Sequence, residues 1–469
     1  MRPMSHTLTP RLEKLPAVAA GCLLVACLAL LSGCSDADGQ TTSTADHFLL
    51  AAMGSDDAVA KASMLFIEEN WDRSMVPMAV EAAVYTASGE IRNRMSRLMV
   101  LEAEDQNVRD INDVYFWLWN EDYEPHPEYA DFKAGLYRQI DPRFERYFLD
   151  RQDSARIRLD EIRWGGVGQD GIPPLRNPDM IAAEDADYLE DDHVVFGITV
   201  NGDARAYPKR ILAWHEMFTD VIGGVPIAGV YCTLCGTVIP YRTRLDDVEY
   251  ELGTSGFLYR SNKLMYDKAT QSLWSTERGE PVLGPLVDKG IALPFESVVT
   301  TTWGEWRRRN PSTSVLSLDT GHSRDYGEGV AYADYFATDR LMFNTPFNDQ
   351  RLENKREVLA LRFAGAPNQQ LAIDTAFLEQ NALYENRIGP QKFIVLTDAS
   401  GANRVYDPGD VKFVAYDQDV TVTDVQGTQW RLDEEKLSSA TGQSLPRLPY
   451  HRAFWFGWHA AFPQTQLIK

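Results

Sequence analysis

The larger, C-terminal part of this 469-residue chain contains an internal repeat, which constrains the fold more than any other feature of the sequence. Residues 388–406 (IGPQKFIVLTDASGANRVY) match residues 222–240 (IGGVPIAGVYCTLCGTVIP) without a gap. Shorter matches occur in the same order along the chain: 357–365 with 193–202, 428–433 with 272–277, and Trp455, Trp458 and Pro463 with Trp303, Trp306 and Pro311. The repeat therefore predicts two copies of one unit of about 110 to 130 residues.

The residue pattern within each copy is typical of β-strands. Val225 to Tyr231 and Val238 to Tyr241 are apolar and rich in β-formers, and the glycines at 223 and 224 precede them. Asp192 to Tyr207 predicts a second hairpin around Asn201-Gly202, a strong two-residue turn signal. A short helix is expected from Lys209 to Asp220. We therefore predict an α+β fold whose duplicated unit is mainly antiparallel β with short helices.

Residues 47–149 have a different pattern, because apolar residues recur there at three- and four-residue spacing. This predicts an independent domain of helix pairs that resembles HEAT repeats. The full domain prediction is a signal peptide at 1–33, a tether at 34–46, the helical domain at 47–155, the first β-rich copy at 160–318, a bridge at 319–355 and the second copy at 356–469.

The N-terminus has the features of a bacterial lipoprotein signal. Arg2, Arg11 and Lys14 precede the apolar stretch 17–33, which ends in Leu-Ser-Gly followed by Cys34. In such a signal the cysteine is acylated and becomes the mature N-terminus. We therefore expect an exported protein that is anchored to a membrane through Cys34 and faces the periplasm or the cell surface. Ser35 after the cysteine favours the outer membrane.

Composition narrows the classes of function. The net charge of −22 argues against a nucleic-acid partner, because such binding requires a basic surface. The sequence has no phosphate loop, no dinucleotide fingerprint and no histidine-glutamate zinc-protease motif, so we expect no nucleotide cofactor. The helical domain is expected to contact another protein of the cell envelope.

The five cysteines leave one candidate site. Cys22 and Cys27 lie in the predicted signal peptide and Cys34 carries the predicted lipid, so only Cys232 and Cys235 remain in the folded part. In an oxidising compartment such a pair is a local disulfide, a redox-active dithiol or two thiolates bound to a metal.

The surroundings of this Cys-x-x-Cys pair resemble a metal knuckle. The pair lies between two predicted strands and is followed by Gly236, whereas a thioredoxin-type pair lies between a strand and a helix. Two thiolates supply half of a tetrahedral site, so other residues must complete it. We expect His215 to face the same pocket, with His459 or Met265 as a further ligand. A set of two Cys, one or two His and a Met suits copper or zinc.

The second copy lacks these groups. Asp398 and Gly401 align with the two cysteines, and Asn381 aligns with His215. The chemistry is therefore expected in the first copy only.

Several of these segments resemble a family of exported bacterial proteins known as domain of unknown function 3179. The resemblance runs from about Trp164 to Leu467 and rests on segments such as GDARAYPKRILAWHEMFTDVIGGVPIAGVYCTLCGT, GTSGFLYRSNKLMYDKATQSLW and FWFGWHAAFPQT. It implies that Cys232, Cys235, Trp-His-Glu at 214–216 and Met-Tyr-Asp at 265–267 are motif positions of the family. The resemblance implies no particular activity.

Three hypotheses about function therefore stand together. The chain is a lipid-anchored protein that binds copper or zinc, a thiol-disulfide oxidoreductase that uses Cys232 and Cys235, or a scaffold in which an inert disulfide holds a hairpin. The sequence does not decide whether the chain is an enzyme.

Overall fold

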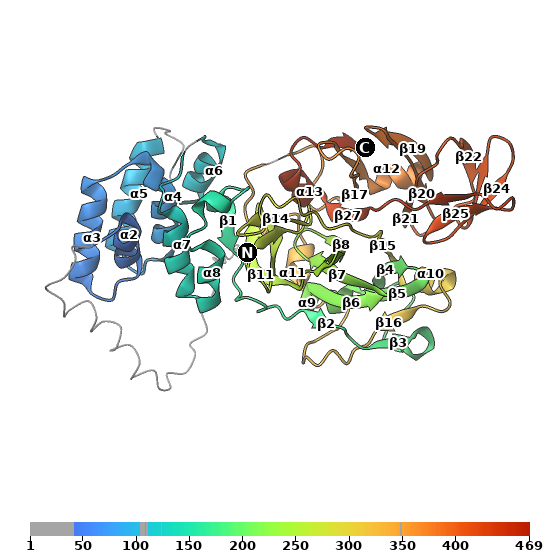
Figure 1. Cartoon of the computed structure of the whole chain (residues 1–469), viewed down its shortest axis with the longest axis horizontal. Helices are drawn as coiled ribbons and strands as arrows, with labels where there is room; N and C mark the ends of the chain where they lie inside the picture. The colour runs from blue at the N-terminus through green and yellow to red at the C-terminus, as the bar shows by residue number, and fades with distance from the viewer. Residues whose placement is uncertain (1–41, 104–107, 109–110, 123, 348) are drawn as a thin grey trace, which may run out of the picture. The chain divides into compact units, whose positions relative to one another are not determined.

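The computed structural model describes residues 42–469, apart from 104–107, 109–110, 123 and 348. The predicted signal peptide, Cys34 and most of the predicted tether lie outside these residues. Among the described residues, a helical region is followed by a mainly antiparallel β region with short helices (Figure 1). The predicted α+β fold is confirmed.

The helical region begins earlier than expected, because its first helix starts at Thr44, within the predicted tether. Its α-helices are α2 (Thr44–Met53), α3 (Asp57–Glu69), α4 (Val76–Tyr85), α5 (Gly89–Ala103), α6 (Ile111–Asn120), α7 (Tyr129–Arg138) and α8 (Glu145–Phe148). Asp56 caps α3 by accepting hydrogen bonds from the backbone N–H groups of Ala58 and Val59. The likeness to HEAT repeats stays a prediction.

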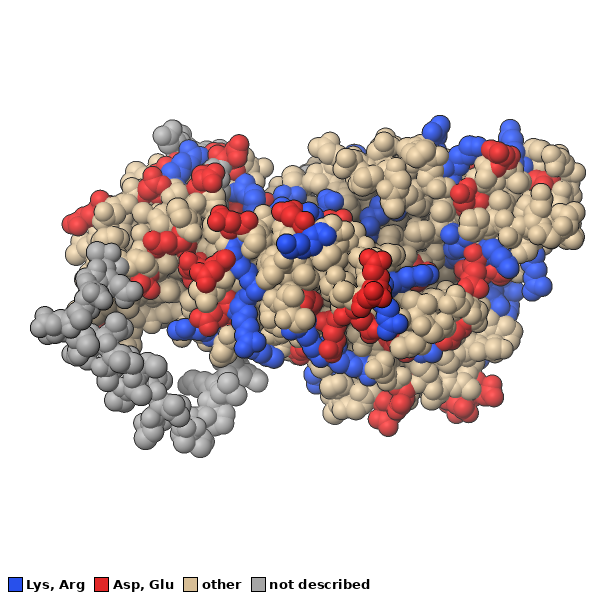
Figure 2. Space-filling view, viewed as in Figure 1, with Lys and Arg blue, Asp and Glu red and all other residues tan. Residues whose placement is uncertain are grey.

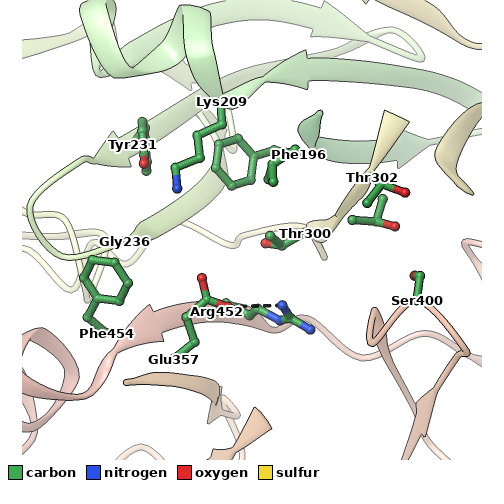
Figure 3. Close-up of a pocket in the computed structure, with 12 residues that line it drawn as sticks. Phe196, Lys209, Tyr231, Gly236, Thr300, Thr302, Glu357, Ser400, Arg452 and Phe454 are labelled. Atoms are coloured by element: carbon green, nitrogen blue, oxygen red, sulfur yellow. Dashed lines mark hydrogen bonds and ion pairs between the residues drawn. The ribbon is translucent and has the colours of Figure 1, made fainter. Parts of the chain in front are cut away.

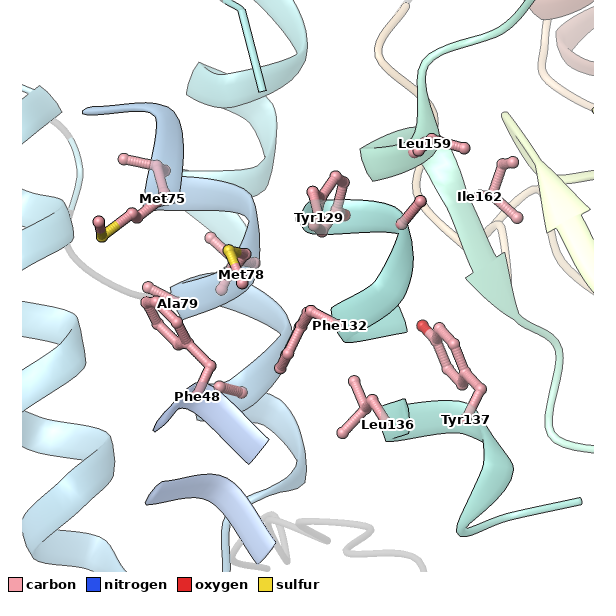
Figure 4. Close-up of a cluster of buried hydrophobic side chains, with 14 of the residues drawn as sticks. Phe48, Met75, Met78, Ala79, Tyr129, Phe132, Leu136, Tyr137, Leu159 and Ile162 are labelled. Carbon is pink, nitrogen blue, oxygen red and sulfur yellow. The ribbon is translucent and has the colours of Figure 1, made fainter. Parts of the chain in front are cut away.

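The core of the helical region extends into the β region. Phe48 of α2, Met78 of α4 and Phe132 of α7 are fully buried and pack in one cluster, part of which Figure 4 shows. The same cluster contains Phe257, whose ring lies 4.9 Å from that of Tyr137 in α7. The helical region therefore shares a hydrophobic core with strands of the β region, and the boundary between separate domains stays a prediction.

A buried ion pair also ties the helices to the sheet. The ammonium of Lys133 on α7 contacts the carboxylate of Glu81 on α4, and both side chains are almost completely inaccessible. Lys133 also donates a hydrogen bond of 3.0 Å to the carbonyl of Ile162. Because an unpaired buried charge is costly, these contacts specify how α4, α7 and the adjoining strand pack together.

The first copy contains three sheets of three or more strands. Their strands are β1 (Ile162–Trp164), β2 (Leu175–Arg176), β3 (Met180–Ala182), β4 (Val194–Val200), β5 (Asp203–Pro208), β6 (Met217–Ile222), β7 (Val225–Cys232), β8 (Thr237–Arg242), β11 (Leu252–Tyr259), β12 (Asn262–Asp267), β13 (Leu273–Ser275), β14 (Glu280–Leu283), β15 (Val299–Thr302) and β16 (Ser314–Leu316). The sheet orders are β15-β4-β5-β16-β3, β2-β6-β7-β8 and β1-β11-β12-β13-β14. Helices α9 (Lys209–His215) and α10 (Trp303–Arg309) connect strands, and β9 (Arg244–Leu245) and β10 (Val248–Glu249) form a small ribbon.

The second copy repeats this topology. Its elements are β17 (Glu357–Arg362), β18 (Gln370–Asp374), α12 (Thr375–Gln380), β19 (Leu383–Ile388), β20 (Gln391–Thr397), β21 (Asn403–Tyr406), β22 (Phe413–Tyr416), β23 (Thr421–Asp424), β24 (Gln429–Leu432), β25 (Lys436–Ser439), β26 (Ser444–Pro446), β27 (His451–Phe454), α13 (Trp455–Ala461) and β28 (Gln466–Ile468). The order β27-β17-β18-β28 reproduces β15-β4-β5-β16, including the parallel pairing of the last two strands. The sheet β19-β20-β21 likewise reproduces β6-β7-β8. The predicted duplication is confirmed.

Matching side-chain contacts recur in both copies. The indole N–H of Trp306 donates to Thr313 at 2.9 Å, and that of Trp458 donates to Thr465 at 2.9 Å. The indole of Trp274 donates to Asp267 at 3.2 Å, and that of Trp430 donates to Asp424 at 3.0 Å. Each buried indole therefore has an acceptor, as a buried N–H requires. These contacts give Trp306 and Trp458 matching structural roles. They also give a structural role to Asp267, the aspartate of the Met-Tyr-Asp motif.

One predicted element is shorter than expected. The predicted helix from Lys209 to Asp220 ends at His215, and β6 begins at Met217. Glu216 between them has φ of 55°, in the left-handed region, where its backbone N–H still caps α9 by donating to Leu212. The prediction missed the end of the helix because a glutamate in this conformation is uncommon. The hairpins predicted around residues 201–202 and 232–235 are confirmed.

Charged side chains of both signs are interspersed on the face shown in Figure 2, where the described residues form no continuous basic surface. No helix among the described residues is long and apolar enough to cross a lipid bilayer.

Candidate functional site

Cys232 and Cys235 lie at the tip of the β7–β8 hairpin and are joined by a disulfide bond. The backbone closes this tip as well, since the N–H of Cys235 donates to the carbonyl of Cys232 at 3.1 Å. Cys232 is 3% exposed and Cys235 is 0% exposed. Cys232 is therefore slightly more exposed than Cys235, although other parts of the chain cover both residues.

Three distant segments cover the disulfide. The tip of the β11–β12 hairpin supplies Ser261, whose carbonyl oxygen lies 3.5 Å from the sulfur of Cys235. The second copy supplies Phe454, whose backbone N–H donates to the carbonyl of Cys235 at 2.7 Å. It also supplies Gly457, where a Cβ atom would lie 3.0 Å from the Cβ of Cys235. A glycine at 457 thus allows α13 to approach the pair.

The third covering segment is the bridge between the two copies, residues 319–355. Its short helix α11 (Ala333–Phe336) carries Tyr335, whose hydroxyl donates to the carbonyl of Leu234 at 2.8 Å. Tyr335 and the partly buried Phe343 belong to the same apolar cluster as the two cysteines. The bridge therefore covers the hairpin tip with aromatic side chains.

A buried polar network lies next to the cysteines. The ammonium of Lys263 donates to the carboxylate of Glu216 at 3.0 Å, and the hydroxyl of Tyr332 donates to the other carboxylate oxygen at 3.0 Å. Burial lowers the pKa of Lys263, and it raises the pKa of Tyr332. Glu216 is adjacent to the pair through its backbone carbonyl, which accepts the N–H of Tyr231 at 2.9 Å. Such a network can give or take a proton in a site from which water is largely excluded.

Two residues of this network have strained backbones. Glu216 has φ of 55° and Tyr332 has φ of 58°, and both side chains are joined by the hydrogen bond just described. Each such conformation costs about 1 kcal/mol or more in a residue other than glycine. Strain of this kind concentrates at functional sites, so the network is a candidate for more than structural packing.

His215 does not reach the cysteines through any contact in the structure. Its Nδ1 lies 2.8 Å from the carbonyl of Pro173, and its Nε2 lies 2.5 Å from the hydroxyl of Tyr326. Because a carbonyl can only accept, Nδ1 carries the proton and Nε2 accepts from Tyr326. Burial lowers the pKa of His215, which favours this neutral form. Both ring nitrogens therefore have partners, and a metal would have to displace Tyr326.

All three residues of the Trp-His-Glu motif contact the bridge. Trp214 donates to the carbonyl of Asp325 at 2.7 Å, His215 bonds Tyr326, and Glu216 bonds Tyr332. The motif thus anchors the segment that covers the disulfide.

The other predicted ligands lie in separate surroundings. The Nε2 of His459 is 3.3 Å from a carboxylate oxygen of Asp349, and its ring packs against Trp455. Met265 is fully buried in a cluster with Met217 and Trp274. The described residues contain no group of three or more His, Cys, Asp or Glu side chains arranged to hold a metal ion. The structure thus supplies no third ligand of this kind beside the thiolates, and binding of copper or zinc stays a prediction.

A cavity of about 180 Å³ begins beside the hairpin tip. It lies between the two copies and is lined by Val194, Phe196, Lys209, Tyr231, Gly236, Thr300, Thr301, Thr302, Glu357, Ser400, Arg452 and Phe454. Figure 3 shows the Lys209 side chain extending from α9 into this space, opposite the ion pair of Glu357 with Arg452. Lys209 Nζ also lies 4.6 Å from the ring of Phe336 in α11, so the cavity adjoins the bridge.

Sequence reasoning missed Lys263, Tyr332 and Tyr335. Lys263 follows a hairpin turn, where the sequence predicts an exposed lysine. The two tyrosines lie in a segment whose apolar residues have no regular spacing. Glu216 had a visible signal, because it adjoins Trp214 and His215 in one motif, but its charge alone did not distinguish it from many other carboxylates.

A family model described as "Protein of unknown function (DUF3179)" matches residues 169–465. The chain belongs to this family. The match spans both copies and the bridge, and it starts after the helical region. No curated protein and no solved structure matches the chain.

Proposed function

We propose that this member of the DUF3179 family is a thiol-disulfide exchange protein in which the Cys232–Cys235 bond is reversibly reduced. The observation that carries the proposal is the second copy, whose matching hairpin tip closes around Asp398 without any disulfide. A disulfide that closes so short a loop stabilises a fold by only about 2 kcal/mol. The hairpin therefore has little structural need for the bond, and a chemical role explains its presence better.

The proposed reaction transfers two electrons. A substrate thiolate attacks the sulfur of Cys232, the more exposed residue of the pair, and the bond to Cys235 breaks. Cys235 leaves as a thiolate and takes up a proton. A second substrate thiolate then attacks the substrate sulfur of the mixed disulfide and releases Cys232. The substrate dithiol is oxidised to a disulfide, and the protein disulfide is reduced to two thiols.

We assign the proton transfer to Glu216, Lys263 and Tyr332. The support for this role is the hydrogen bonds of Lys263 and Tyr332 to Glu216, and the backbone contact of Glu216 with Tyr231, the residue before Cys232. Cys235 is the leaving group in this scheme, and its reduced thiol can donate to the carbonyl of Ser261.

Exchange also requires that the bridge move, because Tyr335 and Phe343 cover the sulfurs. The Trp-His-Glu motif holds the bridge in place, so it regulates access in this proposal. The aromatic cover keeps the pair from reacting with unselected thiols until a substrate displaces it.

The test is a redox titration of the folded protein. The protein is equilibrated with mixtures of reduced and oxidised dithiothreitol, and free thiols are counted by alkylation and mass spectrometry. We expect a single two-electron transition in which the circular dichroism of the fold is unchanged. Thiols that appear only after unfolding in urea would show an inert bond and overturn the proposal.

The same experiment separates the redox and metal hypotheses. The reduced protein is purified without oxygen and offered zinc or copper(I) before alkylation. Retention of one metal ion per chain, with both cysteines protected from alkylation, would replace the redox proposal by the metal hypothesis.

The two single-cysteine variants form a matched pair. Cys235→Ser should form a mixed disulfide with an aromatic disulfide reagent faster than Cys232→Ser, because it keeps the more exposed cysteine, Cys232.

We further propose that the protein is exported and anchored through a lipid on Cys34, with the helical region as the contact for another envelope protein. The signal sequence supports the anchor. Replacing Cys34 by Ala should move the protein from the detergent phase to the aqueous phase. A variant of mature mass that stays in the detergent phase would contradict the anchor.

A further inference from the structure

A second cavity, of about 390 Å³, lies between the two copies. Both copies contribute to its wall, which includes Arg278, Glu280, Phe295, Arg362, Phe363 and Phe462. Its volume falls in the range of small-molecule sites, and most of its lining is apolar or aromatic. Cys232, Cys235 and the Glu216 network are not part of it.

Two arginines supply positive charge to this cavity. The guanidinium of Arg278 lies 4.6 Å from the ring centre of Phe462, and that of Arg362 lies 4.3 Å from the ring centre of Phe295. The stacked arrangement leaves the N–H groups at the edge of each guanidinium able to donate. Each arginine therefore offers donors beside an apolar wall.

These donors are incompletely used within the protein. Arg278 donates to the carbonyl of Ala461 at 3.3 Å, and Arg362 donates to the hydroxyl of Tyr241 at 3.1 Å. The buried Nε of Arg362 has no acceptor among the described residues. A buried charged donor without an acceptor is costly, so an external anion would satisfy it.

Two acidic groups lie near the cavity. Burial lowers the pKa of Arg278, and the charge of Glu280 acts in the opposite direction, although Glu280 also lies 3.9 Å from Arg156. Glu277 is buried close by, and neither of its carboxylate oxygens has a hydrogen-bond donor. Burial raises its pKa to about 7, while Arg362 and Arg278 act in the opposite direction. The lining thus carries two guanidiniums and one carboxylate.

We propose that this cavity binds a small organic monocarboxylate with an apolar body. A carboxylate matches the planar donor edge of a guanidinium, and the apolar body would lie against Phe295, Phe363 and Phe462. The apolar walls disfavour inorganic phosphate, because they cannot replace the water around a doubly charged anion. The site is separate from the cysteine pair and does not depend on the function proposed for it.

Isothermal titration calorimetry with benzoate and hexanoate tests the proposal, with benzyl alcohol as the neutral counterpart of benzoate and inorganic phosphate as the competing anion. We expect both carboxylates to bind more tightly than benzyl alcohol or phosphate. Arg362→Ala and Arg278→Ala should each weaken benzoate binding by about tenfold, as expected for loss of a charge-assisted hydrogen bond. Arg146→Ala removes an exposed arginine of the helical region and should leave binding unchanged.

Three outcomes would overturn the proposal. These are absence of carboxylate binding to the folded protein at millimolar concentration, equal binding of benzoate and benzyl alcohol, and phosphate binding as tight as benzoate binding. Arg362→Met is the control for misfolding, because it removes the guanidinium but keeps an apolar side chain of similar length. Its melting temperature is compared with that of Arg362→Ala. A variant with both Cys232 and Cys235 replaced by Ser should bind benzoate as the wild type does, which separates this site from the redox proposal.

Discussion

The two matching hairpin tips of the duplicated unit are closed in different ways. In both, a backbone N–H donates to the carbonyl of the residue three positions earlier, at 3.1 Å between Cys235 and Cys232 and at 2.9 Å between Gly401 and Asp398. The first tip adds a disulfide. The second uses the carboxylate of Asp398, which accepts the backbone N–H groups of Ser400 and Ala402. One fold therefore accepts a covalent or a polar closure.

The difference extends to the surroundings of each tip. Trp214, His215 and Glu216 hold the bridge over the first tip, whereas Gln380, Asn381 and Ala382 occupy the matching positions of the second copy. The carboxylate of Asp398 instead forms ion pairs with Arg404 at 2.7 Å and with Arg309 at 3.4 Å. The two copies share structural contacts, such as the hydrogen bonds of the buried tryptophans. They differ at the hairpin tip and at the residues around it, where the first copy has the candidate functional site.

The largest expected effect is at the tip without cysteines. Asp398→Ala should lower the free energy of unfolding by about 4 kcal/mol, because it removes one partner of a buried ion pair and the acceptor that closes the turn. Urea unfolding measures this loss. Asp410→Ala is the control, since Asp410 is fully exposed beside Lys392 and its removal should leave the free energy of unfolding almost unchanged. A loss at Asp398 no larger than that control would show that the polar closure is dispensable.

The next largest effect is expected at Glu277. Its counterpart in the second copy, Asp433, accepts hydrogen bonds from two backbone N–H groups, whereas no described residue donates a hydrogen bond to the carboxyl of Glu277. Burial raises the pKa of Glu277 from 4.5 to about 7. Folding therefore favours the neutral form of the Glu277 carboxyl. The stability that this form contributes is fully present below pH 4.5 and is lost as the pH rises through about 7. Glu277→Gln should be more stable than the wild type by about 3 kcal/mol at pH 8, and similar to it at pH 4. If the free energies of unfolding of the two proteins are equal from pH 4 to pH 8, Glu277 is not a buried carboxyl without a hydrogen-bond donor.

Removal of the disulfide should have a smaller effect than removal of Asp398. A variant with Ser at both 232 and 235 should lose about 2 kcal/mol or less of unfolding free energy, because the closed loop is short. Urea unfolding under oxidising conditions measures the loss, with the reduced wild type as the second reference. A loss larger than that of Asp398→Ala would make the disulfide the main structural closure and weaken the redox proposal.

The smallest effect on stability is expected at the bridge. Tyr335→Phe removes the hydrogen bond to the carbonyl of Leu234 and should cost about 1 kcal/mol. It should nevertheless speed reduction of the disulfide by dithiothreitol, since the bridge then opens more readily. Tyr384→Phe is the matched control in the second copy, where the hydroxyl accepts from Asn386 at 2.6 Å. Equal reduction rates for the two variants would show that the bridge does not control access.

Much of the fold and part of the site follow from local sequence. The alternation in 192–207 and 225–241 predicted hairpins that the structure contains, because strand pairing across a short turn depends on nearby residues. The end of α9 was missed, since Glu216, the left-handed residue that ends it, has side-chain contacts with Lys263 and Tyr332, which are distant in sequence. The cysteine pair was found, but the residues that cover it were not.

The sequence by itself determined the duplication, the two hairpin tips and the position of Cys232 and Cys235 at one of them. Each of these is encoded by residue types at short, regular spacing, and the repeat makes the pattern visible twice. Only the tertiary structure decided that Tyr335, Ser261 and Gly457 surround the disulfide. These residues come from three distant segments, and their proximity depends on how the sheets, the bridge and the second copy pack together, which no local pattern specifies.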